Sequence, residues 1–254
     1  MTKSDLKPPP RAASLLLEPG TEHLTLAGEI TTAIGTGIMP IVGTARSGKS
    51  MLALAMMEWA VQNTNRDLAF IGVPDIYIEN LPEEMRKRST NPSIGMLSSL
   101  RDSIVLLDDT AVSMNARDSS QTRNKLLNRM AGVISHLGLT ILLTTQSMAG
   151  VDISLLRYVE LAPMVKRIDP MALKVERDSW SEPLLEAQYA LKTVGYHPKF
   201  YYSLSDEIIC QSQLRPWADG NDVLSRPFRY LKQSTLDSML AGRTPKEAKE
   251  DAAE

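Results

Sequence analysis

Apolar and polar positions alternate along this chain in two rhythms, short apolar runs and longer stretches with apolar residues three or four positions apart. The short runs predict strands at Ile38–Val42, Leu68–Val73, Ile104–Leu107, Thr140–Thr144 and Leu161–Val165. The helical spacing predicts helices at Met51–Gln62, Pro82–Lys87, Gln121–His136 and, from a weaker pattern, Pro183–Thr193. Because strands that alternate with helices indicate βαβ crossovers, we expect an α/β fold whose mostly parallel central sheet has helices on both faces.

The two ends of the chain differ in composition from its middle. Residues 1–20 are polar and contain the proline run Pro8–Pro10, which predicts a mobile arm. Residues 236–254 finish in a charged, alanine-rich stretch, which predicts a tail. Of the 254 residues 43% are hydrophobic, which is ample for a buried core. We therefore expect one domain over residues 21–235, flanked by two flexible ends.

Charge and cysteine content narrow the classes of protein that fit. A formal net charge of −2 gives no overall signature of nucleic-acid binding, although a local basic patch remains compatible with it. Cys210 is the only cysteine, which predicts a reducing compartment. The three histidines are far apart in sequence, which argues against a zinc site. No apolar run approaches the roughly 18 residues that span a bilayer, so we expect a cytoplasmic protein with no membrane partner.

The segment GTARSGKS matches the phosphate-binding loop pattern G-x-x-x-x-G-K-S in full, and it lies between a predicted strand and a predicted helix. Its members are Gly43, Thr44, Ala45, Arg46, Ser47, Gly48, Lys49 and Ser50. In such a loop the backbone wraps around a polyphosphate, and free N–H groups at the helix N-terminus point at the anion. We expect Lys49 to reach the β- and γ-phosphates of ATP and Ser50 to ligate Mg²⁺.

Two further strands are predicted to end in polar groups. Ile104–Leu107 is followed by Asp108, the expected Mg²⁺ partner, and by Asp109, which stands where a residue activates the attacking water. A strand that simply stops in an acidic turn is the plainer alternative. Thr140–Thr144 is followed by Gln146, which we expect to sense the γ-phosphate at the same sheet edge. The alternative for this glutamine is a structural role, in which its side chain forms hydrogen bonds with the backbone of the loop.

In their order and spacing, these motifs resemble the FtsK/HerA superfamily of DNA-pumping ATPases. The segments most similar to its small viral genome-packaging members are FIGVPDIYIENLP, LLDDTAVSMNARDSSQTRNKLLNRM, GVISHLGLTILLTTQSMAGVDISLLRYVELAPMVKR and RPWADGNDVLSRPF. The resemblance covers residues 38 to 228. It implies a RecA-like domain, ATP hydrolysis with Mg²⁺, a homo-oligomeric ring, sequence-independent binding of double-stranded DNA, and contact with a capsid or portal component.

The chain departs from this family at one position. Larger members carry an arginine shortly before the sensor strand, where this chain has Ile134–His136. Ring motors of this kind complete each site with an arginine from the neighbouring subunit. Among the nearby candidates Arg117, Arg123 and Arg129, we favour Arg117 because it follows the acidic strand in a polar loop. The basic segment that contains them is compatible with a pore lining and with an ordinary solvated face.

Other functions remain open from the sequence. A zonula-occludens-toxin-like ATPase of phage morphogenesis or secretion is one, although such proteins usually add a membrane-spanning segment. A P-loop small-molecule kinase is another, and it requires an arginine-bearing lid, for which Pro74–Pro92 is the candidate segment. A non-hydrolysing nucleotide switch follows if Asp109 is too short to activate water. Whether the protein stays in a host cytoplasm or joins a virion is also left open.

Overall fold

The computed structural model describes residues 36–71, 73, 75–108, 132–151, 159, 161–212 and 217. In chain order the strands are β1 (Gly37–Val42), β2 (Asp67–Ile71), β3 (Ser89–Thr90), β4 (Ser103–Leu107), β5 (Thr140–Thr145), β6 (Met164–Val165), β7 (Phe200–Ser203) and β8 (Ile208–Gln211). The α-helices are α2 (Lys49–Asn63), α3 (Asp75–Glu79), α4 (Glu83–Lys87) and α8 (Asp178–Thr193). The described residues also form the 3₁₀-helices η2 (Ile94–Ser99), η3 (Met148–Gly150) and η4 (Ala172–Lys174).

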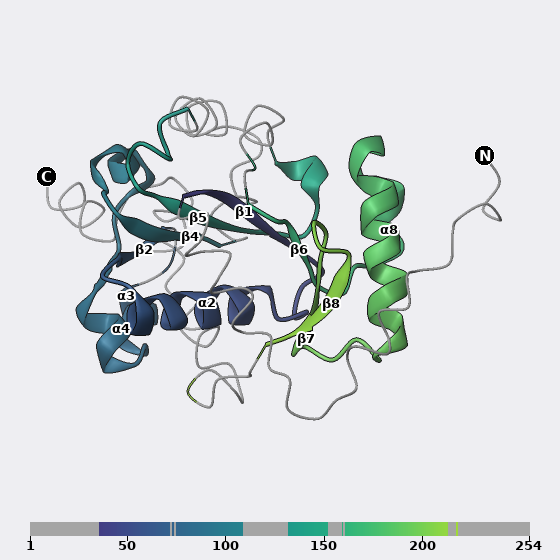
Figure 1. Ribbon diagram of the computed structural model, residues 1–254, viewed down its shortest axis with the longest axis horizontal. Helices are drawn as coiled ribbons and strands as arrows, with labels where there is room; N and C mark the ends of the chain where they lie inside the picture. Colours follow the sequence, from purple (N-terminus) through teal and green to yellow (C-terminus); the bar gives the residue numbers. More distant parts are fainter. Residues whose placement is uncertain are drawn as a thin grey trace, which may run out of the picture.

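The eight strands of the described residues form one sheet in the order β3-β2-β4-β5-β1-β6-β7-β8 (Figure 1). All pairings from β3 to β6 are parallel, and β7 and β8 extend the sheet as an antiparallel hairpin. The mostly parallel α/β arrangement expected from the sequence is therefore confirmed. Strand β5 lies between β1 and β4, with Ile38 opposite Ile141 and Leu143 opposite Leu107. The carboxyl ends of these three strands thus meet at one edge.

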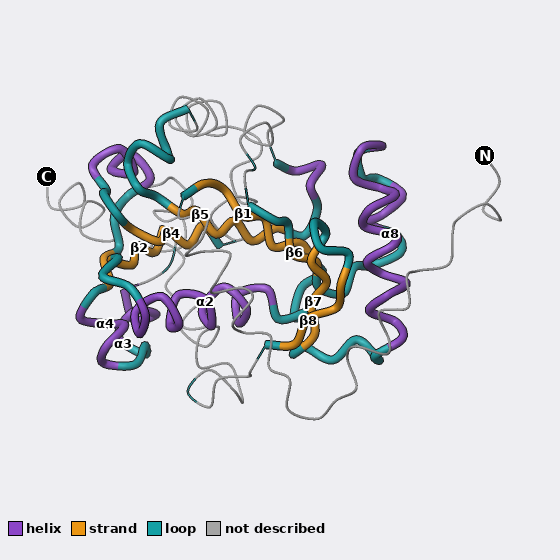
Figure 2. The backbone as a smooth tube through the Cα atoms, viewed as in Figure 1, coloured by secondary structure: helices purple, strands orange, loops and turns teal. Residues whose placement is uncertain are grey.

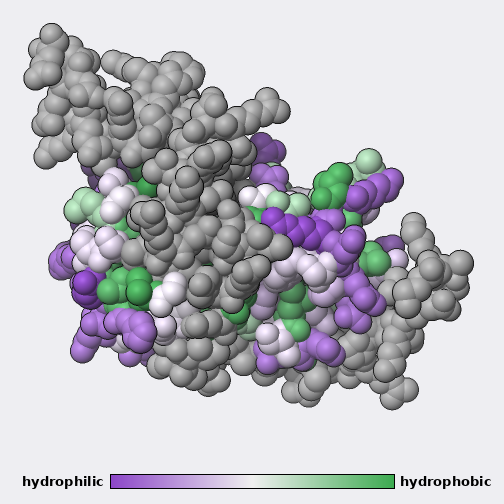
Figure 3. Space-filling view, turned by 90° about the horizontal axis from the view of Figure 1, so that it is seen from above, coloured by the Kyte–Doolittle hydropathy of each residue, from purple (hydrophilic) through white to green (hydrophobic). Residues whose placement is uncertain are grey.

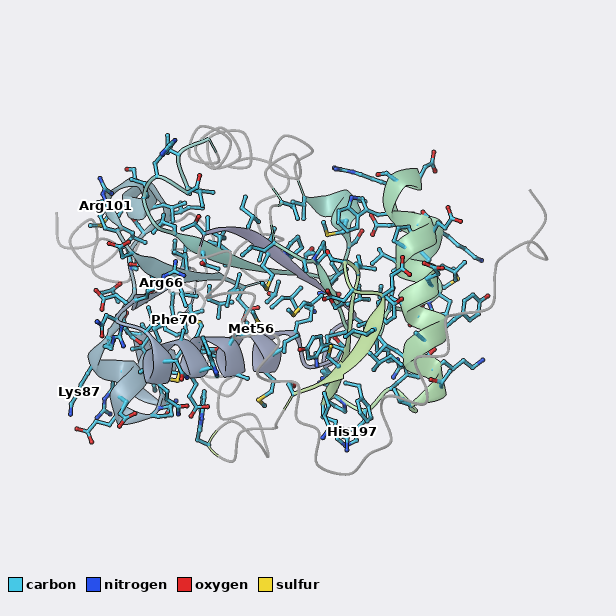
Figure 4. The ribbon with its side chains drawn as sticks, in the orientation of Figure 1. Met56, Arg66, Phe70, Lys87, Arg101 and His197 are labelled. Atoms are coloured by element: carbon cyan, nitrogen blue, oxygen red, sulfur yellow. The ribbon has the colours of Figure 1, made fainter. Side chains whose placement is uncertain are left out.

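Both faces of the sheet are covered, as the continuous apolar strands require. Side chains on one face, among them Met39 and Phe70, pack against α2, which runs beneath the sheet in Figure 2. Met56 of α2 and Phe70 of β2 lie in this layer in Figure 4. The opposite face packs against η2 and residues near Ile134. At the β6–β8 end, α8 contributes Leu184 and neighbouring apolar residues to a third cluster. The layers place the phosphate loop between the sheet and α2.

Proline occurs at position 40 of the central strand β1, where a missing N–H would normally break a ladder. The backbone amides of Gly37 and Gly43 point toward β5, donating to Leu139 O (2.9 Å) and Thr145 O (3.0 Å). The backbone nitrogens of alternate residues in a strand point to opposite neighbours, so the nitrogen of Pro40 faces the β6 side. Pairing with β6 begins only at Ile41, so no ladder hydrogen bond is lost at Pro40.

The predicted elements agree with the structure for β1, β2, β4, β5, α2 and α4 within two residues at each boundary. The predicted strand Leu161–Val165 is too long, since only Met164–Val165 is paired. The weak helical pattern at 183–193 belongs to a longer helix that begins at Asp178. The β7–β8 hairpin was not predicted, because its strands of four residues are too short to show a clear alternation.

The predicted helix Gln121–His136 is only partly described, because residues 121–131 lie outside the described ranges. Its last part is wrong as a helix: residues 132–138 form hydrogen-bonded turns. Leu139 N donates to Ile134 O (3.1 Å) and Gly138 N to Ser135 O (3.1 Å), which is the pattern of a Schellman motif. Gly138 has φ of +69°, the left-handed conformation that this motif needs and glycine tolerates. The chain therefore leaves helical geometry here and enters β5.

The surface of the described residues is mixed. Hydrophobic areas on the face seen in Figure 3 are separated by hydrophilic ones. The exposed large hydrophobic side chains are Ile76, Met96, Val133, Met171, Val175 and Tyr189. None of the helices in the described ranges combines the length and the apolar character needed to cross a membrane.

Candidate functional site

The phosphate loop leaves β1 at Gly43 and enters α2 at Lys49, at the sheet edge where β5 and β6 also end. Gly48 is the N-cap of α2 with φ of +94° and no side-chain cap, so the first-turn N–H groups are available to an anion. A Cβ on Gly43 would lie 2.7 Å from both Lys166 Cβ and Ser47 Oγ. Both glycines of the motif are therefore required by the conformation and packing of the loop.

The side chain of Lys49 is hydrogen-bonded to the backbone of this loop. Its Nζ donates to Gly43 O (2.9 Å) and Thr44 O (3.1 Å), and the side chain is buried. Ser47 Oγ is buried nearby and has no hydrogen-bond partner among the described residues. A buried hydroxyl without a partner is uncommon, and here it lines a loop whose amides and lysine suit phosphate oxygens. The residues present thus fit a polyphosphate.

The side chain of Asp108, one residue beyond β4, is half-buried and accepts two hydroxyl groups. Ser50 Oγ lies 3.1 Å from Asp108 Oδ1 and 3.2 Å from Oδ2, and Thr144 Oγ1 donates to Oδ1 at 2.6 Å. Carboxylate and hydroxyl oxygens are the hard ligands that Mg²⁺ prefers. Within the described ranges no three histidine, cysteine or acidic residues form a metal cluster. A cation held by Ser50 and Asp108 would therefore complete its shell with phosphate oxygens and water, as Mg²⁺ usually does.

Gln146 is the first residue after β5, and its side chain is exposed. The preceding residue, Thr145, accepts a hydrogen bond from Gly43 N at 3.0 Å, so the end of β5 is joined to the start of the phosphate loop. Because β5 lies between β1 and β4, Gln146 stands at the edge between the phosphate loop and Asp108. This is the place from which a carboxamide can reach a terminal phosphate.

Asp109 and Arg117 lie outside the described residues, and so do the other arginine candidates, Arg123 and Arg129. The roles assigned to them remain predictions.

Sequence reasoning missed three residues that shape the site. Thr144 is one of them. The sequence signal that could have identified it is a hydroxyl residue near the end of an otherwise apolar strand. Lys166 and Arg167 follow β6, and Arg167 O accepts Thr44 N at 2.8 Å and Thr44 Oγ1 at 3.3 Å. Lys166 is fully buried, and its Nζ donates to Pro198 O (2.6 Å) and Phe200 O (3.1 Å). Burial lowers the pKa of this amine to about 7.

Lys166 supports the loop at both of its glycines. Its Cβ occupies the space next to Gly43, and the carbonyl to which it donates, Pro198 O, lies 3.0 Å from where a Cβ of Gly48 would stand. The segment before β7 therefore packs directly on the phosphate loop.

No protein-family model matches the sequence, and no curated protein matches it either. Solved structures of similar fold include the DNA-packaging ATPase B204 from Sulfolobus turreted icosahedral virus, with 12% identity over 70% of this chain and 98% of that one and a TM-score of 0.45. B204 from Sulfolobus turreted icosahedral virus 2, in complex with ATP-gammaS, has 12% identity over 70% of this chain and 96% of that one, with a TM-score of 0.45. The ATPases 2 and 3 of Thermomonospora curvata EccC have 9% identity over 82% of this chain and 42% of that one, with a TM-score of 0.45.

Proposed function

We propose that this chain is an ATPase that uses ATP hydrolysis to translocate double-stranded DNA, and that its task is the packaging of a viral genome. The observation that carries the ATPase part is the joint placement of Lys49, the Ser50–Asp108 pair and Gln146 at one sheet edge. A nucleotide-binding loop alone would fit many functions. A carboxylate already bonded to the loop hydroxyl, with a carboxamide just after β5, the strand between β1 and β4, fits hydrolysis of a terminal phosphate.

Each residue then has a defined task. Lys49 and the amides of the loop hold the β- and γ-phosphates, and Ser50 with Asp108 would hold Mg²⁺, which neutralises charge on the phosphate oxygens. Thr144 fixes the orientation of the Asp108 carboxylate. Gln146 contacts the γ-phosphate or the attacking water and reports its presence. Asp109 activates that water, and Arg117 completes the site of a neighbouring subunit in a ring; these two assignments rest on the sequence alone.

The described residues argue against the kinase alternative, because the candidate lid segment is bonded to a part of the molecule far from the phosphate loop. Arg88 Nη1 donates to Val61 O (3.1 Å) and Thr64 O (2.8 Å) at the C-terminal end of α2. Helix α2 has 15 residues, so this end is about 22 Å from the phosphate loop. Lys87 is bridged to Glu83 at 2.7 Å and points to solvent (Figure 4). Closure of this segment over the phosphates would require it to unpack.

The DNA-translocating part of the proposal rests on the resemblance to the FtsK/HerA superfamily. The same resemblance supports a homo-oligomeric ring, sequence-independent contact with the DNA backbone and a capsid or portal component as partner. The basic segment Met114–Arg129 supplies positive charge for phosphates of the duplex, which would make binding weaken as salt rises.

ATP turnover with and without long double-stranded DNA, at low and moderate salt, tests the proposal. We expect stimulation by duplex DNA that declines as salt rises. Lys49→Ala is the control, and it should show no turnover with or without DNA. ATP turnover that does not change when DNA is added, in a protein that stays monomeric, would overturn the proposal of a translocase. Binding of ATP without any turnover would favour the nucleotide switch.

A further inference from the structure

The backbone that follows Gln146 is held by two adjacent residues from another part of the chain. Glu176 Oε2 accepts Ser147 Oγ at 2.8 Å and Met148 N at 3.0 Å. Arg177 Nη2 donates to Val151 O at 2.6 Å and more weakly to Ala149 O at 3.3 Å. The segment 147–151 is therefore bound at several points by the pair Glu176–Arg177.

The same segment has its own local bonds on the side of β5. Thr145 Oγ1 donates to Ser147 O (2.9 Å) and accepts from Ser147 N (3.3 Å), and Ser147 Oγ caps η3 by accepting Ala149 N (3.1 Å). Gln146 lies inside this bonded turn, yet its own side chain is exposed and makes no hydrogen bond among the described residues. The bonds on either side therefore fix the backbone at Gln146 and with it the direction in which its side chain leaves the turn.

The pair that holds the segment belongs to a rigid support. Arg177 is the N-cap of α8, and Glu176 Oε1 accepts Arg177 N at 3.0 Å, so the two side chains start from a fixed helix end. Leu184 and Leu191 anchor α8 in the cluster that also contains Met148. A carboxylate with three donors, on a helix fixed by apolar packing, loses little freedom when it holds a neighbouring loop.

We propose that Glu176 and Arg177 are positioning residues for Gln146, and that they hold the turn after β5 so that the carboxamide is aimed at the γ-phosphate. This inference rests on the proposed function, because it uses the sensing role of Gln146. The bonds that the side chains of Glu176 and Arg177 make within the described residues go to the segment 147–151 and to each other, not to the phosphate loop, so their effect is on the step that Gln146 serves and not on nucleotide binding. Small displacements of such groups are costly: about 1 Å can reduce a rate by about 100-fold.

A double-mutant cycle separates positioning from general structural support. Glu176→Ala should lower kcat for ATP by about 10- to 100-fold while KM and nucleotide Kd change by less than about twofold. Gln146→Ala should lower kcat to a similar degree. The double variant should be no slower than Gln146→Ala alone, because Glu176 acts only through Gln146. Glu182→Ala, an exposed acidic residue on the same helix, is the matched control and should behave as wild type.

The outcomes are distinguishable. A double variant that is slower by the product of the two single effects would overturn the positioning role, and so would a Glu176→Ala variant with wild-type kcat. An unchanged kcat in Gln146→Ala would instead overturn the sensing role assigned under the proposed function. If Glu176→Ala does not fold, Glu176→Gln serves in the same cycle, because its amide keeps one acceptor oxygen for the loop; it should lose less kcat than Gln146→Ala and again add nothing to it.

Discussion

Replacing Lys166 with methionine tests how a fully buried amine is accommodated next to the phosphate loop. The amine donates to two backbone carbonyls and lies 5.7 Å from the ring centroid of Tyr201, and no carboxylate pairs with it among the described residues. With no opposite charge beside it, burial lowers the pKa of Lys166 from 10.5 to about 7. Methionine has a similar shape, but it carries neither a charge nor a donor.

The sign of the effect follows from proton binding. The unfolded chain keeps the ordinary lysine pKa, so between about pH 7 and 10.5 it binds one more proton than the folded protein. The free energy of unfolding of the wild type should therefore rise with pH through this window and fall as pH drops toward 7. The whole pKa difference corresponds to about 5 kcal/mol. The part between pH 7 and pH 9 corresponds to about 2 kcal/mol.

Urea unfolding of the wild type, Lys166→Met and the exposed-residue control Lys192→Met at the two pH values measures this directly. From about pH 7 to about pH 9, the wild type should gain about 2 kcal/mol relative to Lys166→Met, whereas Lys192→Met should follow the wild type. The change with pH carries the test, because methionine also leaves two carbonyls without a donor at every pH. A difference between wild type and Lys166→Met that is the same at both pH values would refute the reasoning.

Two further substitutions probe the site and the core beside it. Asp108→Asn should raise the Mg²⁺ concentration needed for half-maximal turnover by about tenfold or more, because an anionic ligand becomes neutral; an unchanged Mg²⁺ titration would contradict the assignment. Tyr77→Phe should raise the free energy of unfolding by about 1 kcal/mol, because the Tyr77 hydroxyl is buried without a partner among the described residues. Urea unfolding checks this, and a clearly less stable variant would mean that the hydroxyl is satisfied.

The parts of the site that the sequence predicted are those encoded locally. The spacing of Gly43, Gly48 and Lys49 specifies a loop conformation within eight residues, and the apolar strand before Asp108 specifies where that carboxylate emerges. Thr144 and Lys166 act through partners that are 36 and 32 residues away in sequence, respectively Asp108 and Pro198. No local pattern specifies such contacts, since they depend on strand order.

The same distinction applies to the fold. Strands buried on both faces, such as Ile104–Leu107, are continuous apolar runs and could be predicted. The β7–β8 hairpin has partly polar strands, and its turn contains Glu207 with φ of +55° in place of the glycine or asparagine that would mark a turn. The end of the predicted helix before β5 was wrong because apolar spacing continues through Ile134 and Leu137, whereas residues 132–138 form hydrogen-bonded turns that close at Gly138.

The hydrogen bonds from Lys49 to two backbone carbonyls set a minimum interaction energy that a ligand of the loop must supply. An anion that recruits this lysine competes with Gly43 O and Thr44 O for the N–H groups of its ammonium. Hydrogen bonds from a charged donor contribute about 1.5–3 kcal/mol each, so an oxygen that displaces one of these bonds must offset about that much. A single small anion, with few other contacts, gains little from such an exchange. A polyphosphate that also reaches the helix N-terminus and Ser50 gains much more, so discrimination against simple anions is built into the resting contacts of the loop itself.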